Sequence, residues 1–154
     1  MNKPLSAVIG GATGTAVLTV ALLVIEVETR SRIGLFEVVA RFVGVGDNVA
    51  LGFVLFVLAG TVAWPLVFVG LEAYLPMGPD PALRGAGFAL PLWVAFVLLG
   101  RGDLSGAILI VFGVLTLFAH VAYGFTLGSV YGRLSGETAA RRPGYPDAVD
   151  DTER

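Results

Sequence analysis

The sequence contains no cysteine and few charged residues: charged side chains make up 14% of its 154 residues, against 56% for hydrophobic ones. The absence of cysteine excludes disulfide bridges, thiolate metal sites and cysteine nucleophiles. The scarcity of charge excludes an ordinary soluble domain, in which about 25% of residues are charged. Lysine occurs once, at Lys3, and the absence of a basic patch argues against binding to nucleic acid.

The sequence instead has four long segments without charge. Asp, Glu, Lys and Arg are missing from residues 4–25, 48–71, 85–100 and 104–132. Each segment is close to the roughly 20 residues that a helix needs to cross a hydrocarbon core of about 30 Å. The pattern predicts an all-α, polytopic integral membrane protein whose partner is the lipid bilayer. We expect a transmembrane domain over residues 1–133, with spans at 5–25, 49–74, 82–99 and 105–133.

Two further segments do not span. Residues 33–43, IGLFEVVARFV, place Glu37 and Arg41 one turn apart among apolar residues. This predicts a short amphipathic helix on the membrane surface, although the same pattern fits a helix packed over the end of the bundle. Residues 134–154 are polar and rich in charge, which predicts a disordered tail.

Lysine and arginine are distributed unevenly between the two sides of the predicted membrane domain. With four spans, six basic residues lie on the side of the two termini and four on the other. The positive-inside rule then predicts a multi-pass protein of the cell membrane with cytoplasmic termini. Within the spans, Pro65 and Pro91 each remove one backbone hydrogen bond and predict a kink.

Small residues recur at every fourth position on two of the predicted spans. They are Ser6, Gly10 and Gly14 in the first span and Gly124, Gly128 and Gly132 in the fourth. Such ridges let two helices approach closely in lipid, where no hydrophobic effect drives association. We expect the first and fourth spans to pack against each other, or one of the ridges to form a homodimer.

The single histidine, His120, lies near the middle of the fourth span, followed on the same helix by Tyr123 and Tyr131. These three are the candidate functional polar residues. One imidazole is too few for a metal centre, which takes three or four ligands, so we predict no metal and no cofactor. We interpret His120 as bonded to a hydroxyl or carbonyl of a neighbouring helix. Contact with a haem or a quinone is the alternative.

Acidic residues occur at the ends of the predicted spans and not at depth. Glu26, Glu28 and Glu72 are interpreted as ordinary interfacial charges. Hydrolase, kinase and dinucleotide signatures are absent, and GGATGTA at residues 10–16 lacks the lysine and preceding strand of a phosphate loop. We therefore expect no catalytic residues and no enzyme activity.

The fourth span carries a recognisable pattern, AHVAYGFTLGSVYG at residues 119–132. It resembles the last helix of an uncharacterised family of small prokaryotic four-helix membrane proteins, a domain of unknown function, with the motif H-x-x-Y-G-x-x-x-G-x-x-Y-G. GGATGTAVLTVALL and LRGAGFALPLWV are similar to the first and third helices of that family. The resemblance implies four spans and marks His120, Tyr123 and Tyr131 as family positions, but it implies no activity.

Three functions remain open. The favoured one is a non-catalytic accessory or assembly subunit of a larger membrane complex, with a respiratory complex as the candidate. It rests on two small-residue ridges, no charge at depth and a surface helix, and its partners would be other membrane-protein subunits. The second is a passive channel or carrier formed by a homo-oligomer. The third is a haem-binding electron carrier that uses His120.

Overall fold

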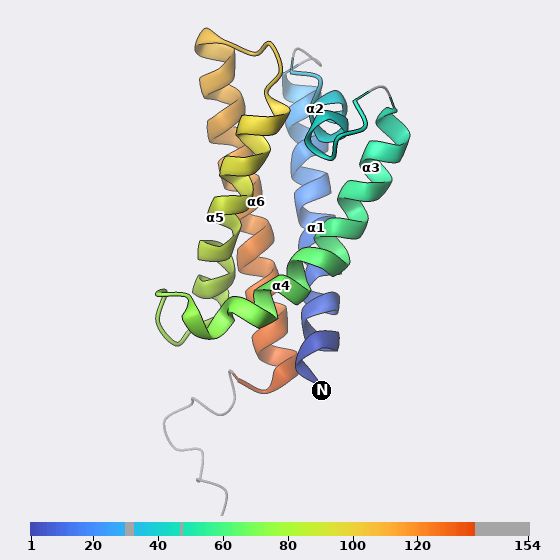
Figure 1. Cartoon of the computed structure of the whole chain (residues 1–154). Coiled ribbons are helices and arrows are strands. Elements are labelled where there is room, and N and C mark those ends of the chain that lie inside the picture. Colours follow the sequence, from blue (N-terminus) through green and yellow to red (C-terminus); the bar gives the residue numbers. More distant parts are fainter. Residues whose placement is uncertain (30–32, 47, 138–154) are drawn as a thin grey trace, which may run out of the picture.

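The computed structural model describes residues 1–29, 33–46 and 48–137, and every regular element within these ranges is a helix (Figure 1). Four helices are long and apolar enough to cross a membrane. They cover Lys3–Glu28, Val49–Tyr74, Pro81–Gly100 and Gly106–Ser135, with mean hydropathies of 2.2, 2.3, 1.8 and 2.2. The all-α, multi-pass membrane fold is therefore confirmed. Most of the predicted tail, residues 138–154, lies outside the described residues.

Three of the four spans begin after a side chain that caps the first helical turn. The Asn2 carboxamide accepts from the Leu5 N–H ahead of α1 (Lys3–Glu28), and Asp80 accepts from the Ala82 N–H ahead of α5 (Pro81–Gly100). Short polar residues at this position satisfy backbone donors that the helix leaves unpaired. The last span, α6 (Gly106–Ser135), ends at Gly136, whose φ of 83° suits glycine.

The second span is built from four consecutive helical pieces. They are α3 (Val49–Leu58), a π-helical turn η1 (Ala59–Ala63), α4 (Trp64–Leu71) and a 3₁₀ turn η2 (Glu72–Tyr74). The change of pattern falls directly before Pro65, which lacks the N–H that an α-helix needs. By contrast, α5 runs without interruption through Pro91.

The bundle is organised around α6, which packs along α1 on one side and along α5 on the other (Figure 1). The second span packs on α1 through η1 and α4, whereas α3 and α4 meet α5 chiefly through the ring pairs Phe56–Phe96 and Phe68–Phe88. The ends of α1 and α6 meet, because the amino group of Met1 donates to Leu134 O at 3.2 Å.

The predicted amphipathic segment forms α2 (Leu35–Phe42), which packs on α3 and α5 at the end of the bundle opposite Met1 (Figure 1). Val38, Val39 and Ala40 are buried in the protein, so its apolar side faces the bundle. Of the two arrangements considered for this helix, the structure shows the packed one. The first turn is fixed by the Glu26 carboxylate, which accepts from the Leu35 N–H at 2.8 Å.

Candidate functional site

The glycine ridges lie at two different helix contacts. On α1, a Cβ at Gly10 would meet Leu127 O at 2.7 Å, and one at Gly14 would meet Tyr123 O at 2.9 Å, so this ridge faces α6. On α6, Cβ atoms at Gly124 and Gly128 would lie 2.1 and 2.0 Å from backbone oxygens of α5. Ser6 and Gly132, the other members of the ridges, are also buried.

The partner of the α6 ridge is a glycine that the sequence reasoning missed. A Cβ at Gly85 would lie 2.0 Å from Gly124 O, and one at Gly124 would lie 2.1 Å from Gly85 O. Backbone therefore touches backbone at this crossing, which only glycine permits. The available signal was the spacing of small residues from Gly85 to Ala89 on the third span.

Tyr123 compensates for the proline in the second span. The Trp64 N–H bonds to Ala59 O, five residues back. With that offset the donor for Gly60 O would be residue 65, but Pro65 has no N–H. The hydroxyl of Tyr123 donates to Gly60 O at 2.8 Å and ties α6 to the π-helical turn.

Tyr123→Phe is expected to lower the free energy of unfolding by about 1 kcal/mol, the usual size of an interhelical hydrogen bond in a membrane protein. The measurement is the unfolding midpoint in mixed detergent micelles, followed by helicity. In a Pro65→Ala background, residue 65 gains an N–H that can donate to a carbonyl one turn earlier, such as Gly60 O. Tyr123→Phe should then cost less than in the unmodified chain. An equal cost in both backgrounds would contradict this assignment.

Among the described residues His120 bonds to no neighbouring helix, so the interpretation from sequence was wrong on this point. Its Nδ1 lies 2.8 Å from Thr116 O, one turn earlier on α6. The ring packs instead against Phe96 of α5, with centroids 4.9 Å apart and the ring planes tilted by 47°. A polar side chain in a helix can bond to the backbone carbonyl four residues earlier instead of to a group on another helix.

His120→Leu is therefore expected to change stability by less than about 1 kcal/mol, because an apolar group of similar size replaces a bond made within one helix. Unfolding in detergent measures this. A loss of several kcal/mol would show that the imidazole holds two helices together after all.

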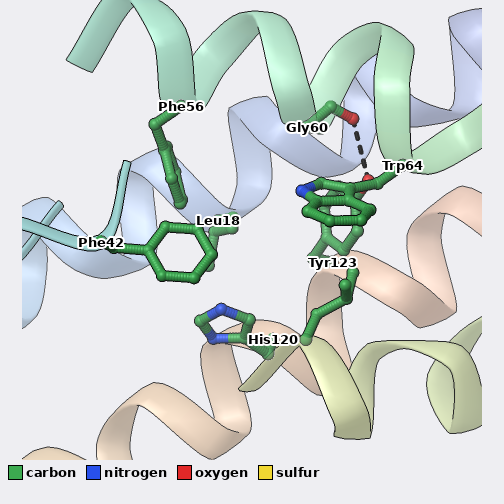
Figure 2. A pocket seen from close by; sticks show the side chains of 8 residues that line it. Leu18, Phe42, Phe56, Gly60, Trp64, His120 and Tyr123 are labelled. Carbon is green, nitrogen blue, oxygen red and sulfur yellow. Dashed lines mark hydrogen bonds between the residues drawn. The ribbon is translucent and has the colours of Figure 1, made fainter. Parts of the chain in front are cut away.

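The imidazole of His120 forms the floor of a small cavity at the middle of the bundle (Figure 2). The volume open to the centre of a water-sized sphere is about 20 Å³, enough for one water molecule. Its walls are mostly aromatic and come from all four spans and the end of α2: Leu18, Phe42, Phe56, Gly60, Trp64, Leu92 and Tyr123. The macrocycle of a haem does not fit this space, so the geometry does not support the haem interpretation.

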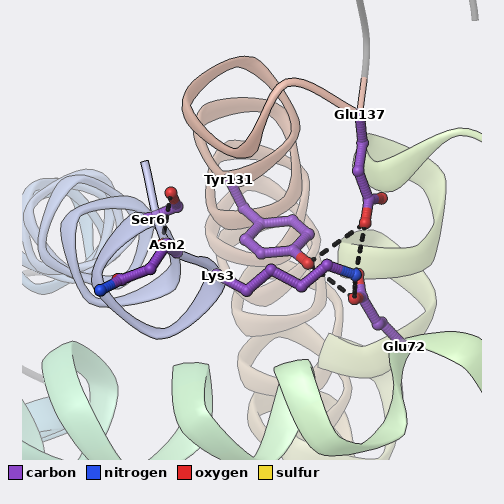
Figure 3. A network of polar contacts seen from close by, with 6 residues as sticks. All are labelled: Asn2, Lys3, Ser6, Glu72, Tyr131 and Glu137. Carbon is purple, nitrogen blue, oxygen red and sulfur yellow. Dashed lines mark hydrogen bonds and ion pairs between the residues drawn. The ribbon is translucent and has the colours of Figure 1, made fainter. Parts of the chain in front are cut away.

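A second polar group lies at the end of the bundle where α1 and α6 meet (Figure 3). Lys3 Nζ is 2.8 Å from Glu72 Oε1 and 2.7 Å from Glu137 Oε1, so one ammonium pairs with two carboxylates. The Tyr131 hydroxyl donates to the same Glu72 oxygen at 2.6 Å. We call Lys3, Glu72, Tyr131 and Glu137 the polar cluster.

The position of Glu72 at a helix end had suggested an ordinary interfacial charge. In the structure it is instead a buried carboxylate. The residue is 5% exposed and Tyr131 is fully buried. The sequence carried little sign of this, because Lys3 and Tyr131 lie 69 and 59 residues away along the chain. Glu72 is thus a candidate site residue that sequence reasoning missed, and Tyr131 gains a partner through it.

The profile of DUF6789, a family of unknown function, matches residues 1–142. The chain belongs to DUF6789. No curated protein and no solved structure matches it. Membership agrees with the resemblance to an uncharacterised family that the last span suggested.

In this DUF6789 chain the cavity and the polar cluster are separated by packed apolar side chains. Leu127 and Phe68 are fully buried between them along the bundle, and Phe68 packs edge-on against Tyr131 with centroids 5.5 Å apart. Within the described residues no three His, Cys, Asp or Glu side chains gather where they could hold a metal ion. The arrangement suits helix packing and local hydrogen bonding better than conduction along the bundle.

Proposed function

We propose that this DUF6789 chain is a non-catalytic accessory or assembly subunit of a larger membrane complex, with a respiratory complex as the candidate. The observation that carries the proposal is the filled interior of the bundle, in which Leu127 and Phe68 are fully buried between the cavity and the polar cluster. A bundle packed in this way provides a rigid body and no continuous polar route.

The surface that remains for a partner is apolar. Both glycine ridges are used within the chain, which argues against the homodimer that a free ridge would form. Outward-facing side chains on one side of α6 are large and exposed, with Phe118 at 69% and Ile110 at 67%. In a membrane complex this side of α6 is the contact we propose, since aromatic side chains are enriched at the core of protein interfaces.

Purification from native membranes in a mild detergent, followed by mass spectrometry, tests the proposal. We expect a stoichiometric set of other membrane subunits that is lost on Phe118→Ala. Leu99→Ala on α5 is the matched control, because Leu99 is 62% exposed and lies on a different helix from the proposed contact. A homo-oligomer without other subunits would overturn the proposal and favour the passive channel, which liposome flux would then measure.

We also propose that the protein resides in the cell membrane with cytoplasmic termini. The support is the excess of basic residues on that side. Because the sequence lacks cysteine, single cysteines report sidedness directly. An impermeant maleimide added to intact cells should label Glu28→Cys and not Arg133→Cys, both exposed at opposite ends of the bundle. The reverse pattern would overturn this orientation.

The pattern H-x-x-Y-G-x-x-x-G-x-x-Y-G is proposed as a signature of DUF6789 and the family as prokaryotic. The support is structural, because His120, Tyr123 and Gly124 meet the cavity, Gly60 and Gly85 respectively. An alignment of members in which these positions vary freely, or which is dominated by eukaryotes, would overturn it.

A further inference from the structure

The cavity above His120 has a lateral mouth. Leu18, Phe56 and Tyr123, which line its depth, are less than 9% exposed, whereas Phe42, Trp64 and Leu92 are only half-buried. The mouth therefore lies between the second span and α5, whose backbones are mostly apart and which meet through the ring pairs Phe56–Phe96 and Phe68–Phe88. Since the mouth lies part-way along two spanning helices, a molecule dissolved in the hydrocarbon region reaches the cavity when these half-buried side chains turn outward.

One nitrogen of His120 is available at the floor of this cavity. Nδ1 lies 2.8 Å from Thr116 O, and a carbonyl oxygen only accepts, so Nδ1 carries the proton of the neutral ring. Nε2 is then an acceptor, and none of the described residues bonds to it. Figure 2 shows this side of the ring directed toward Leu18 and Phe42, across the cavity. The residue is 4% exposed, so bulk water does not solvate the free lone pair.

The other polar side chains around the cavity do not compete as acceptors. The hydroxyl of Tyr123 donates to Gly60 O at 2.8 Å, and the indole nitrogen of Trp64 can only donate, which leaves Nε2 as the acceptor without a donor. A ligand that satisfies it must present an O–H or N–H group. The ligand must also be neutral, because the cavity walls offer no opposite charge to offset the cost of burying an ion.

We propose that this cavity is a binding site for a neutral, membrane-soluble phenol, which enters between the second span and α5 and donates its hydroxyl to His120 Nε2. The space at the floor, about 20 Å³ for a water-sized sphere, matches one hydroxyl oxygen. The ring lies in the mouth beside Phe42 and Trp64, where offset or edge-on aromatic contacts add to the burial of apolar surface.

The dimensions allow this placement if the half-buried side chains at the mouth turn outward. The space at the floor, about 20 Å³ for the centre of a water-sized sphere, takes the hydroxyl oxygen alone, so the ring needs this movement to enter the mouth. A phenol that carries an alkyl tail would leave the tail in the lipid and place only its ring in the protein.

The test uses nuclear magnetic resonance on the single histidine, so that no assignment is needed. The full chain, with ¹⁵N-labelled histidine, is placed in lipid nanodiscs and titrated with 4-decylphenol. The methyl ether of the same compound, 4-decylanisole, partitions into lipid but has no hydrogen to donate. We expect a saturable shift of the Nε2 signal with the phenol and none with the ether, while the Nδ1 signal stays nearly constant. No shift with the phenol, or equal shifts with both, would overturn the proposal.

Two variants separate the site from effects on the lipid. Leu92→Trp fills the mouth and is expected to abolish the saturable shift, whereas Leu98→Trp, at a position 66% exposed on the same helix, should leave it unchanged. His120→Leu should remove the rise in unfolding temperature that the phenol produces in the unmodified chain. A shift that survives Leu92→Trp, or a temperature rise that survives His120→Leu, would contradict the proposal. The purified chain alone is used, so the outcome does not depend on any partner subunit.

Discussion

Gly85→Ala is expected to reduce the free energy of unfolding by about 3 kcal/mol or more, the upper end of the range for overpacked sites. The new Cβ would lie 2.0 Å from Gly124 O and 2.9 Å from Gly128 N. Both atoms belong to the backbone of α6, so no side chain can rotate away and the two helices must separate. The loss extends beyond one contact, because α5 packs chiefly against α6.

Unfolding in mixed detergent micelles, followed by helicity, measures this effect, and the chain offers a matched control. Gly113 lies on α6, and a Cβ added there would have nothing within 4 Å, so Gly113→Ala should change stability little. Gly128→Ala should behave like Gly85→Ala, because its Cβ would lie 2.0 Å from Pro81 O. Comparable midpoints for Gly85→Ala and Gly113→Ala would show that α5 and α6 do not cross in this way.

Glu72→Ala is expected to cost about 2–3 kcal/mol, the size of a lost hydrogen bond between a buried hydroxyl and a charged acceptor. The substitution removes the oxygen that accepts from Tyr131 at 2.6 Å, and the remaining contact of that hydroxyl, to Glu137 Oε1, is 3.4 Å long. Lys3 contributes less, since its side chain is 53% exposed and water replaces its partner.

Three companion variants make the test of Glu72 specific. Glu72→Gln keeps an acceptor for Tyr131 and should cost less than Glu72→Ala. Glu28→Ala, at an exposed acid on another helix end, should cost less than about 0.5 kcal/mol. In a Tyr131→Phe background the cost of Glu72→Ala should fall, because the two residues share one bond. Additive costs for Glu72→Ala and Tyr131→Phe would contradict the bond.

The four spans were predictable because a helix needs about 20 largely uncharged residues to cross the hydrocarbon core. Segments of about this length are visible in the sequence. The structure places the second span at Val49–Tyr74, where the sequence analysis expected a span at 49–74 around the uncharged residues 48–71. The proximity of the first and last spans followed from the spacing of Gly10 and Gly14. The spacing does not show which neighbouring helix each ridge faces. The contact of the α6 ridge with Gly85 on α5 is therefore known only from the structure.

The polar features were less predictable, because each depends on residues that are distant in the sequence or on a choice of hydrogen-bond register. Pro65 indicates that a carbonyl in the second span lacks its donor, but the π-helical offset decides that the carbonyl is that of Gly60. The burial of Glu72 depends on helices that begin and end the fold. For His120, no pattern of residues distinguishes a bond to Thr116 O of its own helix from one to a group on another helix.

The polar cluster also has a consequence for biosynthesis. Lys3 and Glu72 are translated well before Tyr131 and Glu137, so a nascent chain that has delivered its second span to the bilayer carries a carboxylate whose shielding is incomplete. The fourth span supplies the missing hydroxyl and closes the bundle over it. Assembly of the polar cluster thus waits until α6 has left the ribosome, well after Lys3 and Glu72 have been made.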